Sequence, residues 1–144
     1  MQVRDIMSSA FAVIPCQASL RAAAQRMREF DVGVLPAVEE GELIGVLTDR
    51  DIAVRAVAGG SDPEASRVAD ILTPGAEICR DTEEVENAAR RMAQARVRRL
   101  VVQDVDREIV GVLSVDDLLH RLPERHPAME GLRRLPSGGP GAIG

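Results

Sequence analysis

The sequence predicts an α/β fold in which one β-α-β-β-α unit occurs twice. The first observation is an internal repeat, in which Val3-Arg4-Asp5-Ile6-Met7 returns as Val68-Ala69-Asp70-Ile71-Leu72. The second is that each copy has apolar residues at helical spacing, followed by two short apolar runs. The third is composition, because the 144 residues include no Trp, no Tyr and only two Phe. The core is therefore expected to be aliphatic, and the chain to be a tandem duplication.

The repeat continues beyond its first five residues. At an offset of 65 (68 − 3), the matched pairs are Leu20 with Val85, Ala23 with Ala88, Ala24 with Ala89, Met27 with Met92, Val32 with Val97, and Leu35 with Leu100. One inserted residue raises the offset to 66 and matches Gly45 with Gly111, Thr48 with Ser114, and Asp51 with Asp117. Because only one gap separates so many matches, duplication is a better explanation than chance.

Each copy is expected to contain the same elements in the same order. The helices follow from apolar residues at i, i+3, i+4 and i+7, which place those residues on one face. The expected elements are extended segments at 12–14 and 77–79, helices from the N-caps Ser19 and Thr82 to about Phe30 and Ala95, strands at 34–38, 43–47, 100–103 and 109–113, and second helices after Thr48 and Ser114 to about Ala58 and Leu122.

The domain boundaries follow from the repeat and from runs of Gly and Pro. The expected domains are 1–62 and 63–124, and 125–144 is expected to be a flexible tail, with a turn of helix at 129–135 as the alternative. A unit of about 60 residues is marginal alone. The two sheets are therefore expected to pack face to face as a pseudo-twofold pair.

Composition excludes several classes of function. The net charge of -5 argues against nucleic-acid binding, which draws on a basic surface. No apolar run approaches the roughly 20 residues that cross a bilayer, and the N-terminus lacks a signal peptide's apolar region, so we expect a cytoplasmic protein with no membrane partner. Two cysteines without CxxC spacing and two late histidines are too few to predict a zinc site. Cys16 and Cys79 are expected to be unpaired thiols.

Two near copies of one motif mark the end of the last strand in each copy. They read GVLTDRD at 45–51 and GVLSVDD at 111–117. One interpretation is a capping box, in which the hydroxyl and the acid three residues later satisfy backbone N–H groups at a helix start. The other is a ligand site, because a strand that leads into a helix N-terminus presents free N–H groups suited to phosphate. A carboxylate one turn inside can accept both hydroxyls of a ribose, and the two interpretations are compatible.

The tandem pattern resembles a pair of CBS domains, the cystathionine β-synthase-type modules also found in IMP dehydrogenase. The resemblance rests on Asp-Ile-Met before the first half, the alanine-rich helix ending in Met, and the doubled G-h-h-[ST]-x-x-D element, where h is apolar. It spans about residues 3–122. The arrangement also resembles stand-alone bacterial stress-response proteins that consist of a CBS pair and little else.

In that family, clefts between the paired domains commonly take AMP, ADP, ATP or S-adenosylmethionine. The resemblance implies that Asp51 and Asp117 accept ribose hydroxyls, with Thr48 and Ser114 near the ribose or phosphate. The residues it implies beside the two bases are Ile14, Leu35 and Pro36, and Ile78, Leu100 and Val101. A nucleotide is thus expected as a regulatory ligand, with no obligatory cofactor and no metal.

The two sites are not expected to be equal. Arg50 lies beside the first helix start, where it can bind phosphate, whereas the equivalent position in the second half holds Asp116. Arg98 and Arg99 are expected either to compensate from the neighbouring strand or to be a solvated strand end.

Three other functions compete with nucleotide binding. An enzyme is not expected, because His120 and His126 fall outside the motifs, and Asp51 and Asp117 belong to two separate sites. A ligand-independent interaction module is the main alternative, with a homodimer through the helices after Thr48 and Ser114 and an effector protein that the sequence does not identify. A redox role for Cys16 and Cys79 is a third possibility.

Overall fold

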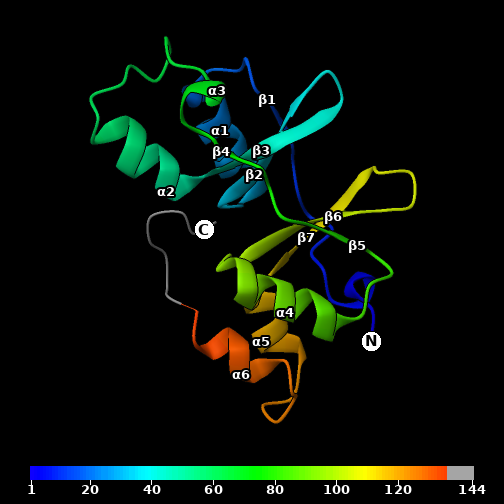
Figure 1. The fold of residues 1–144 in the computed structure, drawn as a ribbon. Helices are drawn as coiled ribbons and strands as arrows, with labels where there is room; N and C mark the ends of the chain where they lie inside the picture. The colour runs from blue at the N-terminus through cyan, green and yellow to red at the C-terminus, as the bar shows by residue number, and fades with distance from the viewer. Residues whose placement is uncertain (136–144) are drawn as a thin grey trace. The chain divides into compact units, whose positions relative to one another are not determined.

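The computed structural model describes residues 1–135, which form two compact units (Figure 1). One unit is Phe11–Ala76, and we call it the Thr48 unit. The other combines Met1–Ala10 with the described residues from Glu77 to Leu135, and we call it the Ser114 unit. Each unit is mixed α/β with one sheet of its own, as the sequence predicts. Among the described residues, no helix has the length and apolarity needed to span a membrane.

The Thr48 unit has a four-stranded sheet in the order β1-β2-β3-β4. Strand β1 is parallel to β2, and the other neighbours are antiparallel. A two-residue turn, Glu40 and Gly41, joins β2 to β3 with φ values of 50° and 80°, a conformation that suits the twist of a hairpin. The elements are β1 (Ile14–Pro15), α1 (Leu20–Phe30), β2 (Val34–Glu39), β3 (Glu42–Thr48), α2 (Asp49–Asp51), η2 (Ile52–Val57), α3 (Val68–Ile71) and β4 (Thr73–Pro74).

The Ser114 unit repeats this architecture with three named strands in the order β5-β6-β7. Strand β5 is parallel to β6, and β6 is antiparallel to β7. The elements are η1 (Val3–Asp5), β5 (Ile78–Arg80), α4 (Val85–Ala95), β6 (Arg99–Gln103), β7 (Ile109–Ser114), α5 (Val115–Arg121) and α6 (Met129–Arg133). The core is aliphatic in both units, as expected.

The two long helices end alike but begin differently. Each ends at a left-handed residue, Asp31 or Arg96. Ser19 caps α1 as predicted, because its side chain accepts the N–H of Ala22 at 3.0 Å. The prediction that Thr82 caps the second helix is wrong. Helix α4 begins only at Val85, after the N-cap Glu84, whose side chain makes no capping hydrogen bond. The first helical N–H, that of Val85, donates to the carbonyl of Met1 at 3.0 Å.

The segment in front of each sequence repeat packs on the unit built by the other repeat. In the Thr48 unit, the N–H groups of Val68 and Ala69 each donate at 2.9 Å to the carbonyls of Ala18 and Cys16. In the Ser114 unit, the equivalent donors are Val3 and Arg4, and the acceptors are Glu83 and Asp81, again at 2.9 Å. The expected domains 1–62 and 63–124 therefore each give their leading segment to the other compact unit.

The part of the expected flexible tail that the structure describes is folded. Helix α6 packs against α4 and α5, and its side chains Met129 and Leu132 are buried. This agrees with the alternative of a helical turn after residue 128. The remainder of the expected tail, 136–144, lies outside the described residues.

The second helix of the Thr48 unit is wider than an α-helix. After the short α2, the segment η2 is a π-helix, and Ala58 donates to the carbonyl of Ala53 five residues earlier at 3.1 Å. π-Helical turns are rare and occur often at functional sites. Val54 and Val57 on this segment are 53% and 67% exposed.

We predict that Gly45→Ala lowers the free energy of unfolding by about 1–3 kcal/mol. A Cβ at Gly45 would collide with the backbone oxygen of Thr73 where β4 pairs with β3. The repeat equivalent, Gly111, has the same constraint, with the Ser8 carbonyl 2.8 Å from such a Cβ. Urea denaturation measures the loss. Glu42→Ala, at an exposed end of β3, is the control, and its free energy of unfolding should stay within about 0.5 kcal/mol of wild type. If Gly45→Ala and Glu42→Ala changed stability equally, the close approach of β4 would not require glycine at position 45.

Candidate functional site

The end of β3 carries a closed pair of hydrogen bonds between Thr48 and Asp51. The Thr48 hydroxyl accepts the Asp51 N–H at 3.0 Å, and Asp51 Oδ2 accepts the Thr48 N–H at 3.0 Å. Both residues are buried, with 2% and 8% of their surface exposed. This is a complete capping box, although its acid is the shorter Asp in place of the usual Glu or Gln.

The end of β7 has the same pair with nearly the same distances. The Ser114 hydroxyl accepts the Asp117 N–H at 3.0 Å, and Asp117 Oδ2 accepts the Ser114 N–H at 2.9 Å. Both side chains are partly buried. The structural interpretation of the motif therefore holds in both units, and a ligand would have to bind at these caps without breaking them.

Each cap leaves one carboxylate oxygen outside its own hydrogen bonds. In the Thr48 unit that oxygen is Asp51 Oδ1, and Arg55 Nε lies 3.8 Å from it. A carboxylate has about four acceptor positions, so one oxygen can fix the backbone while the other accepts a hydroxyl. The arrangement can thus hold a diol close to a helix N-terminus.

The charged residues beside the two caps differ between the units. Arg50 is exposed, and its backbone N–H donates to Asp49 Oδ1 at 2.8 Å. In the Ser114 unit, Arg98 Nη2 lies 3.9 Å from Asp116 Oδ1, so Arg98 already faces the acid that replaces Arg50.

Arg99 has a position with no basic counterpart in the Thr48 unit. It is paired with Ser114 across the β6–β7 ladder, whereas Val34 is paired with Thr48. Its Nη1 is buried and has no hydrogen-bond partner in the described structure. A buried guanidinium nitrogen without a partner is costly, since each lost hydrogen bond leaves the desolvation penalty uncompensated. An anion that reached Arg99 Nη1 would compensate this cost.

Two of the apolar residues that the resemblance placed beside a base, Leu35 and Leu100, lie one strand position from the residue paired with the cap hydroxyl. Leu35 is paired with Leu47 in the ladder, and its side chain belongs to the core of the Thr48 unit. Leu100 is likewise buried, opposite Leu113. The other predicted residues divide by exposure into the buried Ile14, Pro36 and Val101 and the exposed Ile78.

Each of the two histidines contacts an oxygen of the Ser114 unit. His120 Nδ1 lies 2.7 Å from the Asp116 carbonyl, and His126 Nε2 lies 3.0 Å from Glu86. Within residues 1–135, no group of three or more His, Cys, Asp or Glu side chains could hold a metal.

Both thiols are free and buried. Cys16 lies in the Thr48 unit and Cys79 in the Ser114 unit. Burial, with a smaller contribution from Glu83, raises the pKa of Cys79 to about 12, and burial raises that of Cys16 as well. Thiols with raised pKa values hold little thiolate at neutral pH, which disfavours the redox role.

Comparison with known proteins matches a family model described as CBS domain to residues 3–57 and 68–124. A CBS domain-containing protein of Bacillus subtilis, YhcV, is 34% identical over 116 residues, covering 81% of each chain. Hypoxic response protein 1 of Mycobacterium tuberculosis is 33% identical over 122 residues, covering 84% of this chain and 85% of the relative.

Solved structures resemble the chain over most of its length. A crystal structure of Hypoxic Response Protein I with two coordinated zinc ions has a TM-score of 0.72 and 31% identity, covering 85% of this chain and 100% of the other. The cytosolic domain of the Mg²⁺ channel MgtE in complex with ATP has a TM-score of 0.70 and 28% identity, covering 84% of this chain and 48% of the other. A hexameric CBS-CP12 protein from bloom-forming cyanobacteria has a TM-score of 0.76 and 28% identity, covering 84% of this chain and 67% of the other.

We predict that Thr48→Val lowers the free energy of unfolding by about 1–2 kcal/mol without ligand, because the buried Asp51 N–H loses its acceptor. Thr82→Val is the matched control, since Thr82 is exposed and caps no helix; its effect should stay within about 0.5 kcal/mol. Denaturant unfolding gives both values. If Thr48→Val and Thr82→Val lowered the free energy of unfolding by the same small amount, the Thr48 hydroxyl would not stabilise the strand end.

Proposed function

The chain belongs to the CBS domain family, and on that premise we propose that it is a regulatory module that binds an adenine nucleotide at its two strand-end caps. The ligand class is AMP, ADP, ATP or S-adenosylmethionine. The single observation that carries the proposal is the doubled cap, in which a hydroxyl and an Asp meet at a helix start. A capping box alone would be served as well by Glu, whereas the shorter Asp keeps its carboxylate close to the strand end.

In the proposed complex, Asp51 and Asp117 accept the ribose hydroxyls through the oxygen that the cap leaves outside its own bonds. Thr48 and Ser114 lie near the ribose or phosphate, close to the N–H groups of the following helix. The MgtE domain, at 28% identity, was solved in complex with ATP, and this supports the ligand class.

We propose that phosphate recognition differs between the units. Arg50 would bind phosphate in the Thr48 unit, and Arg98 and Arg99 would do so in the Ser114 unit. The buried, unpartnered Nη1 of Arg99 supports this assignment, because an anion would compensate its desolvation.

A ligand regulates only if it binds one conformation more tightly than another. We propose that the nucleotide biases the arrangement of the two units, which passes the signal to an effector protein. The similarity to a hypoxic response protein is consistent with a role in stress. The cytoplasmic location stays a prediction.

We predict that at least one of AMP, ADP, ATP and S-adenosylmethionine raises the melting temperature of the full chain, because a ligand specific for the folded state stabilises it by mass action. In calorimetry, Arg50→Ala should weaken the binding of that ligand to the Thr48 unit by about tenfold, since a charge-assisted bond to phosphate is lost.

Arg133→Ala, an exposed arginine on α6, is the control for calorimetry and should leave the affinity unchanged. No heat and no thermal shift with any of the four ligands would overturn the nucleotide proposal. The chain would then keep only its role as an interaction module.

A second function, dimerisation, has its own observation. Val54 and Val57 of η2 are large apolar side chains with more than half of their surface in water, and Leu119 of α5 is also exposed. Exposed apolar side chains that gather on one segment mark association surfaces more often than isolated ones do. The similar CBS-CP12 protein is a hexamer. We propose that η2 and α5 form a homodimer interface.

We predict that the chain is a dimer at micromolar concentration by light scattering, and that Val54→Glu/Val57→Glu makes it monomeric because it would bury two carboxylates. Val105→Glu, on an exposed loop, is the control and should leave the dimer intact. A wild-type monomer at that concentration would remove the dimer proposal while leaving nucleotide binding open.

A further inference from the structure

The outward faces of α1 and α4 occupy equivalent positions of the repeat. On α1 the face consists of Arg21, Ala24, Gln25 and Arg28, whose spacing of i, i+3, i+4 and i+7 places them together. On α4, 65 positions later in each case, it consists of Glu86, Ala89, Arg90 and Ala93. A hollow of about 230 Å³ lies over the α4 face, whereas the four α1 residues form an open surface.

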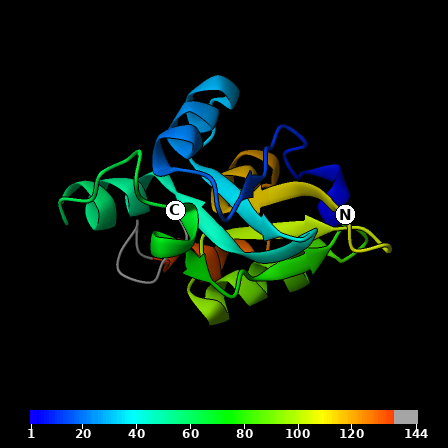
Figure 2. The ribbon, with the colours of Figure 1, turned by 90° about the horizontal axis from the view of Figure 1, so that it is seen from above.

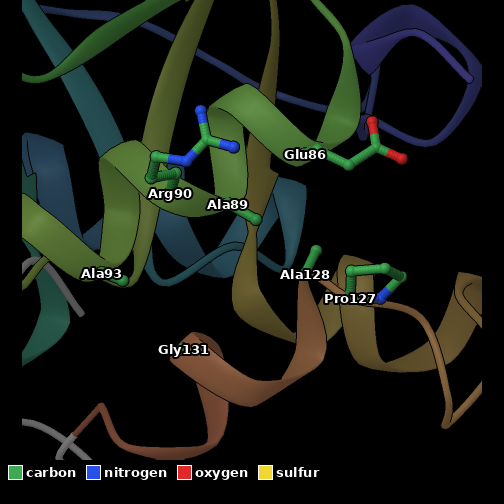
Figure 3. Close-up of a pocket in the computed structure, with 7 residues that line it drawn as sticks. All are labelled: Glu86, Ala89, Arg90, Ala93, Pro127, Ala128 and Gly131. Atoms are coloured by element: carbon green, nitrogen blue, oxygen red, sulfur yellow. The ribbon is translucent and has the colours of Figure 1, made fainter.

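On α4, the chain's own last helix covers this hollow (Figure 3). Pro127, Ala128 and Gly131 line its opposite side, and a Cβ at Gly131 would lie 3.3 Å from Ala93 Cβ. Met129 and Leu132 anchor α6 by burial, and His126 reaches Glu86 at 3.0 Å. This face of the repeat is therefore one on which a short helix packs.

On α1, the only residues within 1–135 that line the equivalent face belong to α1 itself. Ala24 is exposed, whereas its counterpart Ala89 is buried under α6. The formal charge of the four residues is +2 on α1, from Arg21 and Arg28, and zero on α4. This basic face belongs to a chain whose net charge is -5.

One carboxylate of the chain already binds this face. Glu64, in the segment between the two repeats, forms an exposed ion pair with Arg21. Among residues 1–135, no carboxylate is within ion-pair distance of Arg28. The face thus has one arginine that is partnered and one that is available.

We propose that the α1 face is a docking site for an acidic helix of a partner protein, which packs there as α6 packs on α4. The surface is distinct from the strand-end caps and from the η2 and α5 surfaces, and its use does not depend on nucleotide binding. It is a route by which a regulatory module without an effector domain in the described chain contacts its target.

The geometry defines the partner's chemistry. Arg21 and Arg28 are two turns apart, about 10.5 Å along the helix axis, so an aligned helix would meet both with carboxylates seven positions apart. Small side chains over Ala24 would allow close approach, as Ala128 and Gly131 do over α4. The chain's own α6 is occupied on α4, and its arginines would repel this face.

The probe is a synthetic peptide of residues 123–135 with Arg125, His126, Arg133 and Arg134 replaced by glutamate, which places two carboxylates seven positions apart at 126 and 133. It is titrated into the full ¹⁵N-labelled chain. We expect amide shifts confined to α1 and binding that weakens with added salt. Arg21→Glu/Arg28→Glu should weaken binding about tenfold or more, because two attractions become repulsions. Glu64→Gln should strengthen binding about twofold, since it releases Arg21.

Arg90→Glu on the covered α4 face is the matched control and should leave the affinity within about twofold of wild type. If the double charge reversal does not fold by circular dichroism, Arg21→Gln/Arg28→Gln takes its place, with a smaller loss expected. The proposal is overturned if α1 shows no shifts at about 1 mM peptide, a weak-binding limit. It is also overturned if the unmodified basic peptide binds equally well, or if the α1 shifts appear instead with anionic vesicles or single-stranded DNA.

Discussion

The molecule depends on one constraint, which is how the last strand of each unit turns into the helix that follows. The last residue of the strand, Thr48 or Ser114, is buried or half-buried, and its backbone N–H needs an acceptor away from water. The Asp three residues later supplies that acceptor, and the hydroxyl in turn accepts the N–H of the Asp. Buried backbone groups left unpaired would cost about 1–3 kcal/mol each, so these two bonds fix the direction of the helix. They also hold the second carboxylate oxygen of that Asp at the start of the helix.

Duplication has left the caps alike and changed what surrounds them. The backbone repeats closely, since the N–H of Asp49 donates to the Gly33 carbonyl and the N–H of Val115 donates to the Arg98 carbonyl, at 3.0 and 2.9 Å. Gly33 leaves room for the Asp49 carboxylate, with 3.0 Å between a built Cβ and Asp49 Oδ2. At the equivalent position, Arg98 adds a positive charge. The same contrast appears on α1 and α4, where one face is basic and open and the other is covered by α6. The two units are thus equivalent in fold and different in chemistry.

The sequence predicts those elements whose causes are local. Helices α1 and α4 follow from apolar periodicity, and the hairpins of Figure 2 follow from short polar turns between apolar runs. The exchange of leading segments was not predictable from periodicity, because the hydrogen bonds of Val3 and Val68 join residues far apart in sequence. The cap at Thr82 was predicted wrongly for the same reason, since the Met1 carbonyl takes over that role. Helix α6 shows only two apolar anchors among prolines and arginines, too weak a signal to fix a helix.

The candidate site was predictable in part. The hydroxyl and acid of each cap follow from the doubled motif, and the difference between Arg50 and Asp116 can be seen by aligning the copies. Tertiary packing decides that Arg99 Nη1 is buried without a partner. It also decides that the side chain of Leu35 lies in the core. No local sequence pattern records either one.

The central claim is that the cap carboxylates hold a ribose while they hold the backbone. Calorimetry on the full chain with the tightest-binding adenine nucleotide and with its 2′,3′-dideoxy counterpart tests it directly, because the two ligands differ only in the hydroxyls. The account predicts that the dideoxy ligand binds about tenfold more weakly or worse. Equal affinities would contradict it and would leave Asp51 and Asp117 as helix caps alone.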